Sequence, residues 1–215
     1  ILVTGCMAQW WKDEIQARCP QADGFVGVSG YEDIAQVIDQ ALEDQHPAHF
    51  GDIDAPVPET DRVVCTSDYW AWLRIAEGCD NRCAYCIIPF IRGKFRSRPE
   101  EAILAEAQDL AQAGMQELIV VAQDITRYGL DLYGERTLAK LLPKLCAIEG
   151  IHWVRLHYLY PDEITDELID VIANEPKIVK YLDIPIQHCN DAILKAMNRR
   201  DTKAELLELF AKLRS

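Results

Sequence analysis

The stretch spanning residues 71–86 reads AWLRIAEGCDNRCAYC and decides the fold. Its first six residues, 71–76, are mostly apolar and predict a buried β-strand. Three cysteines follow, Cys79, Cys83 and Cys86, with the spacing C-x3-C-x2-C. In parallel sheets and barrels, functional groups lie on the loops at the C-terminal ends of the strands. The stretch therefore predicts a thiol-bearing site at one edge of a parallel sheet.

The chain downstream of this loop repeats a strand-then-helix pattern. We expect strands at 71–76, 117–122, 153–158 and 179–184, and helices at 99–112, 138–148, 162–174, 191–197 and 202–213. Right-handed crossovers would wind these four βα units into a parallel sheet that curves like part of a (β/α) barrel. The predicted class is α/β, with the barrel truncated after its fourth unit.

The first part of the chain predicts a second, smaller α/β unit. Residues 1–43 alternate strand (1–3), helix (9–18), strand (24–28) and amphipathic helix (31–42), as at the end of a small parallel α/β domain. Because the chain opens in a strand without Met or a helix cap, we expect a fragment of a longer protein. Residues 44–68 hold three prolines and several acids and predict a linker, so the second domain covers 69–215.

Composition and charge narrow the class of protein. The chain is 49% hydrophobic and 27% charged, which excludes a wholly disordered chain. No apolar run approaches the ~20 residues of a membrane helix, so we expect a cytoplasmic protein without a membrane partner. The net charge of the whole chain is −13, and residues 1–78 hold 4 basic and 14 acidic side chains. This charge disfavours a general nucleic-acid binder and attracts a basic protein.

The cysteines favour a metal or redox cofactor in a reducing compartment. Eight cysteines in 215 residues are too sparse for a disulfide scaffold. A structural zinc site needs four ligands, and no fourth Cys or His lies within the fifty residues after Cys86. A [4Fe–4S] cluster held by three thiolates leaves one iron open for a chelating substrate. A zinc- or cluster-bearing binding module without catalysis remains an alternative.

Several segments resemble the methylthiotransferase family of radical S-adenosylmethionine (SAM) enzymes. The C-x3-C-x2-C spacing with Tyr85 before the last cysteine resembles the radical SAM superfamily as a whole. The resemblance to the methylthiotransferases is carried by residues 4–9, 74–89, 91–99 and 195–200. It implies a transferase that inserts a methylthio group at an unactivated C–H bond, using SAM, a [4Fe–4S] cluster and an external electron donor.

The resemblance also implies site residues. Cys79, Cys83 and Cys86 would ligate the cluster that binds SAM. The backbone of Tyr85 would reach the adenine of SAM, and Tyr85 can equally pack over the cluster. Gln123 and Asp124 would contact the amino or carboxylate group of SAM, although Asp124 can also cap the turn that follows it.

The family carries a second [4Fe–4S] cluster, which delivers the sulfur. Cys6 resembles the third of its three ligands, and the other two would lie upstream of residue 1. We therefore expect these 215 residues alone to be unable to complete methylthiolation.

Two branches of the family compete. Residues 122–134, 158–161 and 181–188 resemble the branch that modifies the β-carbon of an aspartate in small-subunit ribosomal protein uS12, although Ile125 stands where that branch has Thr. The alternative is the branch that modifies an adenosine of tRNA, and RNA contact is expected through a C-terminal domain beyond this chain. Six side chains are open between structural roles and contact with SAM or substrate: Arg92, Lys94, Arg96, Arg98, Gln187 and His188.

Overall fold

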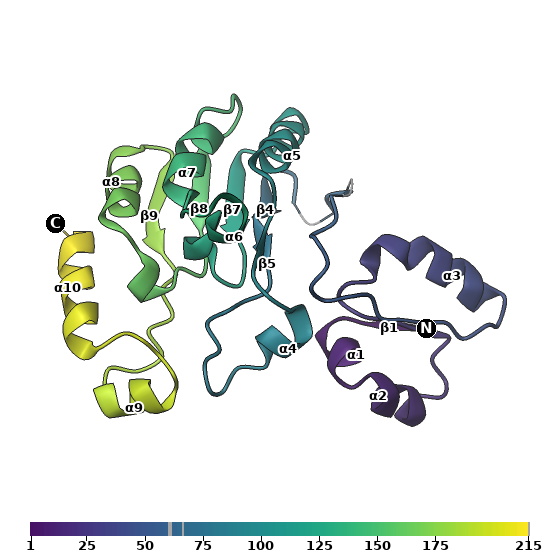
Figure 1. Ribbon diagram of the computed structural model, residues 1–215. Coiled ribbons are helices and arrows are strands. Elements are labelled where there is room, and N and C mark those ends of the chain that lie inside the picture. The colour runs from purple at the N-terminus through teal and green to yellow at the C-terminus, as the bar shows by residue number, and fades with distance from the viewer. Residues whose placement is uncertain (60–61, 66, 215) are drawn as a thin grey trace.

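A four-stranded parallel sheet forms the larger part of the molecule. The computed structural model describes residues 1–59, 62–65 and 67–214. The strand order is β4-β7-β8-β9, which is also the order along the chain (Figure 1). Its strands are β4 (Trp70–Arg74), β7 (Glu117–Val121), β8 (Trp153–Leu156) and β9 (Ile178–Leu182). All three pairings are parallel, which confirms the predicted α/β class and the tandem βα units.

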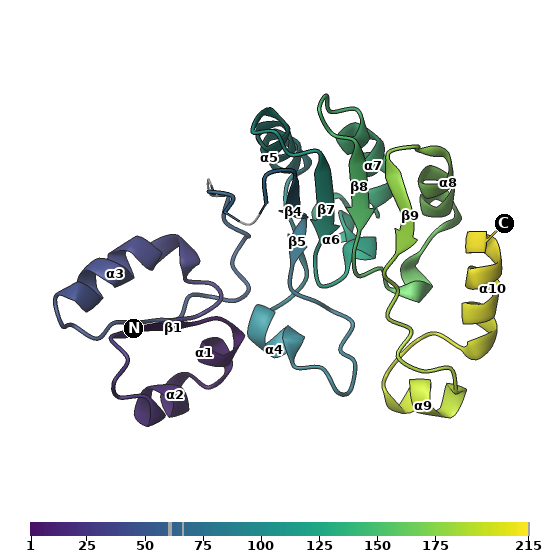
Figure 2. The ribbon, with the colours of Figure 1, turned by 180° about the vertical axis from the view of Figure 1, so that it is seen from behind.

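Helices cover one face of this sheet. They are α5 (Glu100–Gln112), α7 (Leu138–Cys146) and α8 (Asp166–Asn174) (Figure 1). Ala71 and Leu73 of β4 are buried in the core on this face, whereas Trp72 points the other way and is 41% exposed. This alternation is the period of two that a strand imposes on its side chains. The opposite face, seen in Figure 2, is the inner face of the partial barrel.

Short elements gather where the parallel strands end. The loops after β4 and β9 carry α4 (Ile88–Arg92) and α9 (Asp191–Ala196) to the same side of the sheet (Figure 1). The loop after β7 holds a 3-10 turn at Ile125–Arg127 and α6 (Leu130–Tyr133), and the loop after β8 holds a 3-10 turn at Pro161–Glu163. The last helix is α10 (Lys203–Arg214).

A second, three-stranded parallel sheet lies at the N-terminal side of the molecule (Figure 1). Its strands are β1 (Leu2–Thr4), β2 (Gly24–Val26) and β3 (Ala48–His49), and its helices are α1 (Cys6–Trp10), α2 (Lys12–Arg18) and α3 (Ile34–Leu42), which follows a 3-10 turn at Tyr31–Asp33. It has its own small core, formed by Ile15, Ala22 and Phe25. A separate core agrees with a separate α/β unit.

The structure departs from the sequence expectations in short elements. The segment 44–68, expected to be a linker, contributes β3 to the small sheet, because Ala48 and His49 pair with Phe25 and Val26. The helix expected over 9–18 is two helices that meet at Trp11. Two-residue strands β5 (Ala76–Glu77) and β6 (Arg96–Ser97) form an antiparallel ladder that the periodicity did not predict.

Two further boundaries follow local chemistry. The helix expected from 162 begins at Asp166, because the side chain of Thr165 accepts a hydrogen bond from the Leu168 amide and caps it. Helix α5 begins at Glu100, one residue after the expected start, with Pro99 at its N-cap. Across the residues that the structure describes, no helix combines the length and the apolar character that crossing a membrane requires.

Candidate functional site

The loop with the three cysteines projects from the β5–β6 ladder. Gly78 precedes the first cysteine with φ +82°, and a Cβ there would lie 2.0 Å from the Lys94 carbonyl oxygen, so only glycine fits. The Cys79 amide donates to the Gly93 carbonyl over 3.2 Å. The strands before and after the loop thus hold its two ends together, beside the C-terminal end of β4.

All three thiols of this loop are half-buried. Cys79, Cys83 and Cys86 are unpaired and of intermediate exposure. The Cys86 amide donates to the Cys83 carbonyl over 2.9 Å, which closes a turn between these two residues. Burial raises the pKa of the Cys79 thiol, and the charges of Asp124, Cys86 and Cys83 raise it further.

The thiols do not form a closed ligand cage. Within the described part of the chain, no group of three or more His, Cys, Asp or Glu side chains is close enough to hold a single metal ion. A [4Fe–4S] cluster makes a different demand, since each thiolate binds a different iron atom and the sulfurs stand further apart. Three soft donors on one half-exposed loop therefore fit a cluster by their chemistry better than a compact four-ligand zinc site.

The loop is tied to the end of β7 through Asp124. Its Oδ1 accepts from the Thr126 amide over 3.0 Å and caps the 3-10 turn, while its Oδ2 accepts from Asn81 Nδ2 over 2.7 Å. Burial raises the pKa of Asp124, although the bonds from Thr126 and Asn81 oppose that shift. Next to it, the Oε1 of Gln123 is buried and accepts no hydrogen bond from any residue that the structure describes.

The loop is also tied to residues that follow α9. The Ala84 amide donates to the Met197 carbonyl over 2.9 Å, and Asn198 Nδ2 donates to the Arg82 carbonyl over 2.9 Å. Arg82 and Asn198 both have positive φ, at 48° and 57°. Non-glycine residues adopt this conformation rarely, and they keep it where surrounding contacts fix it.

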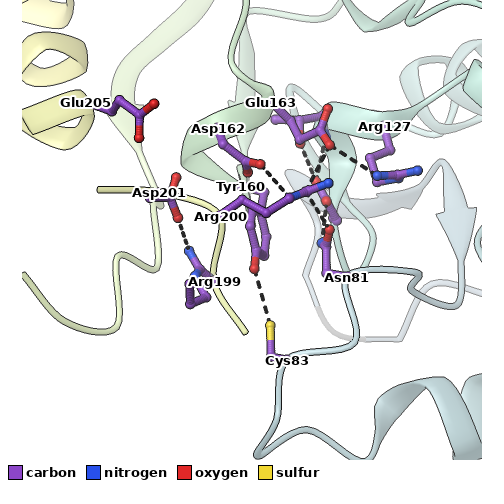
Figure 3. A network of polar contacts seen from close by, with 12 residues as sticks. Asn81, Cys83, Arg127, Tyr160, Asp162, Glu163, Arg199, Arg200, Asp201 and Glu205 are labelled. Carbon is purple, nitrogen blue, oxygen red and sulfur yellow. Dashed lines mark hydrogen bonds and ion pairs between the residues drawn. The ribbon is translucent and has the colours of Figure 1, made fainter. Parts of the chain in front are cut away.

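A polar network surrounds the loop, as Figure 3 shows. Arg200 Nη2 donates to Asn81 Oδ1 over 3.0 Å, and the same guanidinium pairs with Asp162 at 2.6 Å and Glu163 at 2.9 Å. The buried Glu163 carboxylate also accepts from Arg127 over 3.1 Å and from Arg136. The network joins the cysteine loop to the ends of β7 and β8.

Tyr160 reaches one of the cysteines directly. Its hydroxyl lies 3.2 Å from Cys83 Sγ (Figure 3). The guanidinium carbon of Arg199 stands 3.8 Å from the centre of the Tyr160 ring. Arg199 is itself buried, paired with Asp201 at 3.2 Å and bonded to the Pro185 carbonyl over 3.0 Å. The phenol is thereby fixed between a cation and a thiol.

The remaining sequence candidates occupy different surroundings. Tyr85 is 52% exposed on the cysteine loop. Beyond β9, which ends at Leu182 rather than at the expected residue 184, Gln187 is exposed with φ 63°, and His188 Nδ1 accepts from the Asn190 amide over 3.0 Å. Cys6 begins α1 in the small unit, and its sulfur accepts from Arg92 Nη2 over 3.3 Å.

The four basic residues after the loop differ in exposure and in the number of partners that they bond. Lys94 is exposed, and Arg96 donates to the carbonyls of Arg92 and Lys94 over 3.1 and 2.6 Å. Arg98 is buried and forms ion pairs with Glu59 and Glu106. Lys94 is therefore a solvated loop residue. Arg98 is not, because its ion pairs with Glu59 and Glu106 hold it within the fold.

Sequence reasoning named the three cysteines, Gln123 and Asp124, and the structure brings them to one edge of the sheet. It did not assign roles to Asn81, Tyr160 or Arg199. Asn81 and Tyr160 lie within quoted motif segments, and the pair Arg199-Arg200 closes the last one. The two adjacent arginines after α9, Arg199 and Arg200, were the sequence feature that could have indicated this part of the network.

Comparison with known proteins identifies the larger unit. The model of the radical SAM superfamily matches residues 73–215, more than half of the chain. Two solved structures share the fold: the radical S-adenosylmethionine methyltransferase TsrM from Kitasatospora setae (TM-score 0.54, 16% identity, 67% of this chain and 28% of that one), and the cobalamin-dependent S-adenosylmethionine radical enzyme OxsB (TM-score 0.51, 12% identity, 95% and 30%). At these identities they support the fold alone.

Curated relatives align with the whole chain. The chain is 51% identical to ribosomal protein uS12 methylthiotransferase RimO of Lachnoclostridium phytofermentans over 215 residues, covering 100% of the chain and 49% of the relative. Identity to the proteins of the same name from Acetivibrio thermocellus and Geobacter sulfurreducens is 48%, with 49% and 48% of the relatives covered. The chain thus spans about half the length of these relatives. Because the radical SAM superfamily model matches residues 73–215, the chain belongs to the radical SAM superfamily.

Proposed function

We propose that this chain is part of a radical SAM methylthiotransferase that acts on small-subunit ribosomal protein uS12, at the β-carbon of an aspartate. The observation that carries the proposal is the three-cysteine loop at the C-terminal end of β4, in a chain 44–51% identical along its length to proteins named for this activity. The net charge of −13 supports a cationic protein substrate over a polyanion.

Cys79, Cys83 and Cys86 would hold the [4Fe–4S] cluster, and SAM would chelate its open iron. When bound, such a cluster would supply the one-electron reduction of SAM on which radical SAM chemistry depends. The protein contributes ligation, orientation and exclusion of water. Tyr85, on the same loop, is the proposed contact for the adenine of SAM.

Gln123 and Asp124 take different parts in this proposal. Both carboxylate oxygens of Asp124 accept hydrogen bonds within the chain, so Asp124 orients the turn and the cysteine loop, and a contact with the amino group of SAM would use their remaining acceptor sites. The unpaired Oε1 of Gln123 is a buried acceptor, and a buried acceptor without a donor costs about 1–3 kcal/mol. The amino group of SAM is the donor that we propose for it.

The same proposal covers the rest of the chain. Residues 69–215 would form the radical SAM domain, 44–68 the connection, and 1–43 part of a methylthiotransferase N-terminal domain. Cys6 would be one ligand of a second, sulfur-delivering cluster. A ribosomal substrate and an external electron donor agree with a cytoplasmic enzyme, and RNA contact would come from a further C-terminal domain of the whole protein.

The function is tested on the full-length protein with both candidate substrates. Anaerobically reconstituted enzyme, SAM and dithionite are incubated separately with uS12 and with tRNA, and both products are examined by mass spectrometry. The proposal expects a mass increase of one methylthio group on an aspartate peptide of uS12. The same increase on an adenosine of tRNA, with none on uS12, would reject the ribosomal assignment in favour of the tRNA branch.

A further inference from the structure

The hydroxyl of Tyr160 contacts the sulfur of Cys83, beside which Tyr85 and Arg199 also lie. The two residues are 77 positions apart, yet Tyr160 Oη and Cys83 Sγ lie 3.2 Å from each other (Figure 3). Between a phenol and a free thiol, either group can donate. If Cys83 is a thiolate ligand, it has no proton to give, so the phenol becomes the donor.

The ring of Tyr160 is held in this orientation from the other side. Arg199 lies over it at 3.8 Å, and Arg200 lies 5.5 Å from its centre. Arg199 is fixed in turn by Asp201 and by the Pro185 carbonyl, and both Arg199 and Asp201 are buried. A cation over an aromatic face is attracted by the ring and polarises the phenol, which strengthens its O–H as a donor.

A hydrogen bond to a cluster thiolate has a defined electronic effect. Adding one electron to a [4Fe–4S] cluster increases the negative charge on its sulfur ligands. A donor aimed at one of those sulfurs stabilises the reduced form more than the oxidised form, which raises the reduction potential. The effect depends on the donor hydrogen and not on the volume of the ring.

We propose that Tyr160 is a positioning residue that donates a hydrogen bond to the Cys83 thiolate and raises the reduction potential of the cluster. The proposal rests on the proposed function in one respect, namely that Cys83 ligates the cluster. Tyr160 touches neither SAM nor substrate in this account. It acts through the ligand, and Arg199, which holds the ring of Tyr160, also lies beside Cys83.

The test compares three tyrosine variants with the wild-type chain after anaerobic reconstitution. Tyr160→Phe removes the donor and keeps the ring, whereas Tyr160→His keeps an N–H donor. Tyr158→Phe is the matched control, since Tyr158 is 48% exposed and, among the described residues, bonds to a side chain through its amide and not through its hydroxyl. Iron and sulfide are measured for each, and the midpoint potential is measured by titration with electron paramagnetic resonance.

We expect the Tyr160→Phe midpoint to shift to a more negative potential, with Tyr160→His closer to wild type and Tyr158→Phe unchanged. The resonance signal reports only loaded clusters, so a variant that binds less iron is still measured. Equal potentials for wild type and Tyr160→Phe would overturn the inference, and so would equal shifts for Phe and His. A wild-type chain that binds no iron would instead reject the cluster assignment itself, which separates the two failures.

Discussion

Arg92 connects the two parts of the chain through Cys6. Its Nη2 donates to Cys6 Sγ over 3.3 Å, while its Nη1 pairs with the buried Glu77 at 3.0 Å. Glu77 belongs to β5, directly before the cysteine loop. One guanidinium therefore links a proposed ligand of the second cluster to the strand that presents the ligands of the first.

This contact predicts that replacing Arg92 loosens the small unit. Arg92→Met should lower the free energy of unfolding by about 1–3 kcal/mol, because Glu77 loses a charged hydrogen-bond partner. It should also speed hydrogen exchange at the amides of α1, since Cys6 loses its contact. Chemical denaturation and exchange mass spectrometry measure the two effects.

Arg74 supplies the matched control for Arg92. It pairs with the other oxygen of Glu77 at 3.0 Å, and its bonds do not include Cys6. Arg74→Met should destabilise the chain without accelerating exchange in α1. Equal acceleration in both variants would show that the exchange reports general stability, and the proposed link through Cys6 would be wrong.

The buried carboxylate of Glu163 predicts a large loss of stability on neutralisation. It is bound by Arg127, Arg136 and Arg200, and its side chain is 4% exposed. Glu163→Gln should lower the free energy of unfolding by about 1–3 kcal/mol, because the half-buried Arg127 loses its anion while the more exposed Arg136 and Arg200 are screened by solvent. Urea denaturation measures the loss.

An exposed ion pair provides the comparison. Glu135 pairs with Lys140 at 2.7 Å, and its side chain is 60% exposed. Glu135→Gln should change stability by less than ~1 kcal/mol, because solvent screens such pairs. If both glutamine variants lost the same amount, burial would not be what makes the Glu163 network important.

Asp162 predicts a pH dependence. Burial raises its pKa to about 6, with Asp201 and Glu163 adding to the rise and Arg200 opposing it. Between the ordinary aspartate value of about 4 and this value, the folded chain binds more protons than the unfolded one. This group therefore stabilises the fold at low pH, and its contribution falls as pH rises from about 4 to about 6.

The measurement compares wild type with Asp162→Asn in chemical denaturation across pH 4 to 7. The free energy of unfolding of wild type, relative to the variant, should decrease with rising pH by about 1–3 kcal/mol, since one pKa unit corresponds to about 1.4 kcal/mol. A relative stability that increases over this range would mean that the ion pair with Arg200 outweighs burial.

The sequence predicted the main sheet because its strands and helices carry strong periodic patterns. Four expected strands of six residues each, separated by helices, admit few topologies other than tandem βα units. The β5–β6 ladder was missed because two residues per strand give no period to detect. Strand β3 was missed for the same reason, and it lies in a segment rich in proline and acids.

The sequence could predict the site residues that lie close together along the chain. It could not predict contacts between residues that only folding brings together. The three cysteines lie within eight residues, so they are on one loop whatever the rest of the fold is. Arg200 and Asn81 are 119 positions apart, and Tyr160 and Cys83 are 77 apart. Such contacts depend on how the ends of different strands meet, which no local pattern specifies. The capping role of Asp124 was among the alternatives, and the structure provides its partner, Thr126.

The most direct test of the account asks which cysteines hold the cluster. The wild-type chain, Cys79→Ala, Cys83→Ala, Cys86→Ala and Cys146→Ala are each reconstituted anaerobically, and iron, sulfide and zinc are measured per chain. Cys146 is the control, because it lies in the core at 3% exposure and burial raises its pKa to about 12. The account predicts an iron- and sulfide-loaded cluster in wild type and in Cys146→Ala, and its loss in each of the other three variants. Stoichiometric zinc without iron in the wild-type chain, or full iron content after loss of Cys79, Cys83 or Cys86, would contradict it.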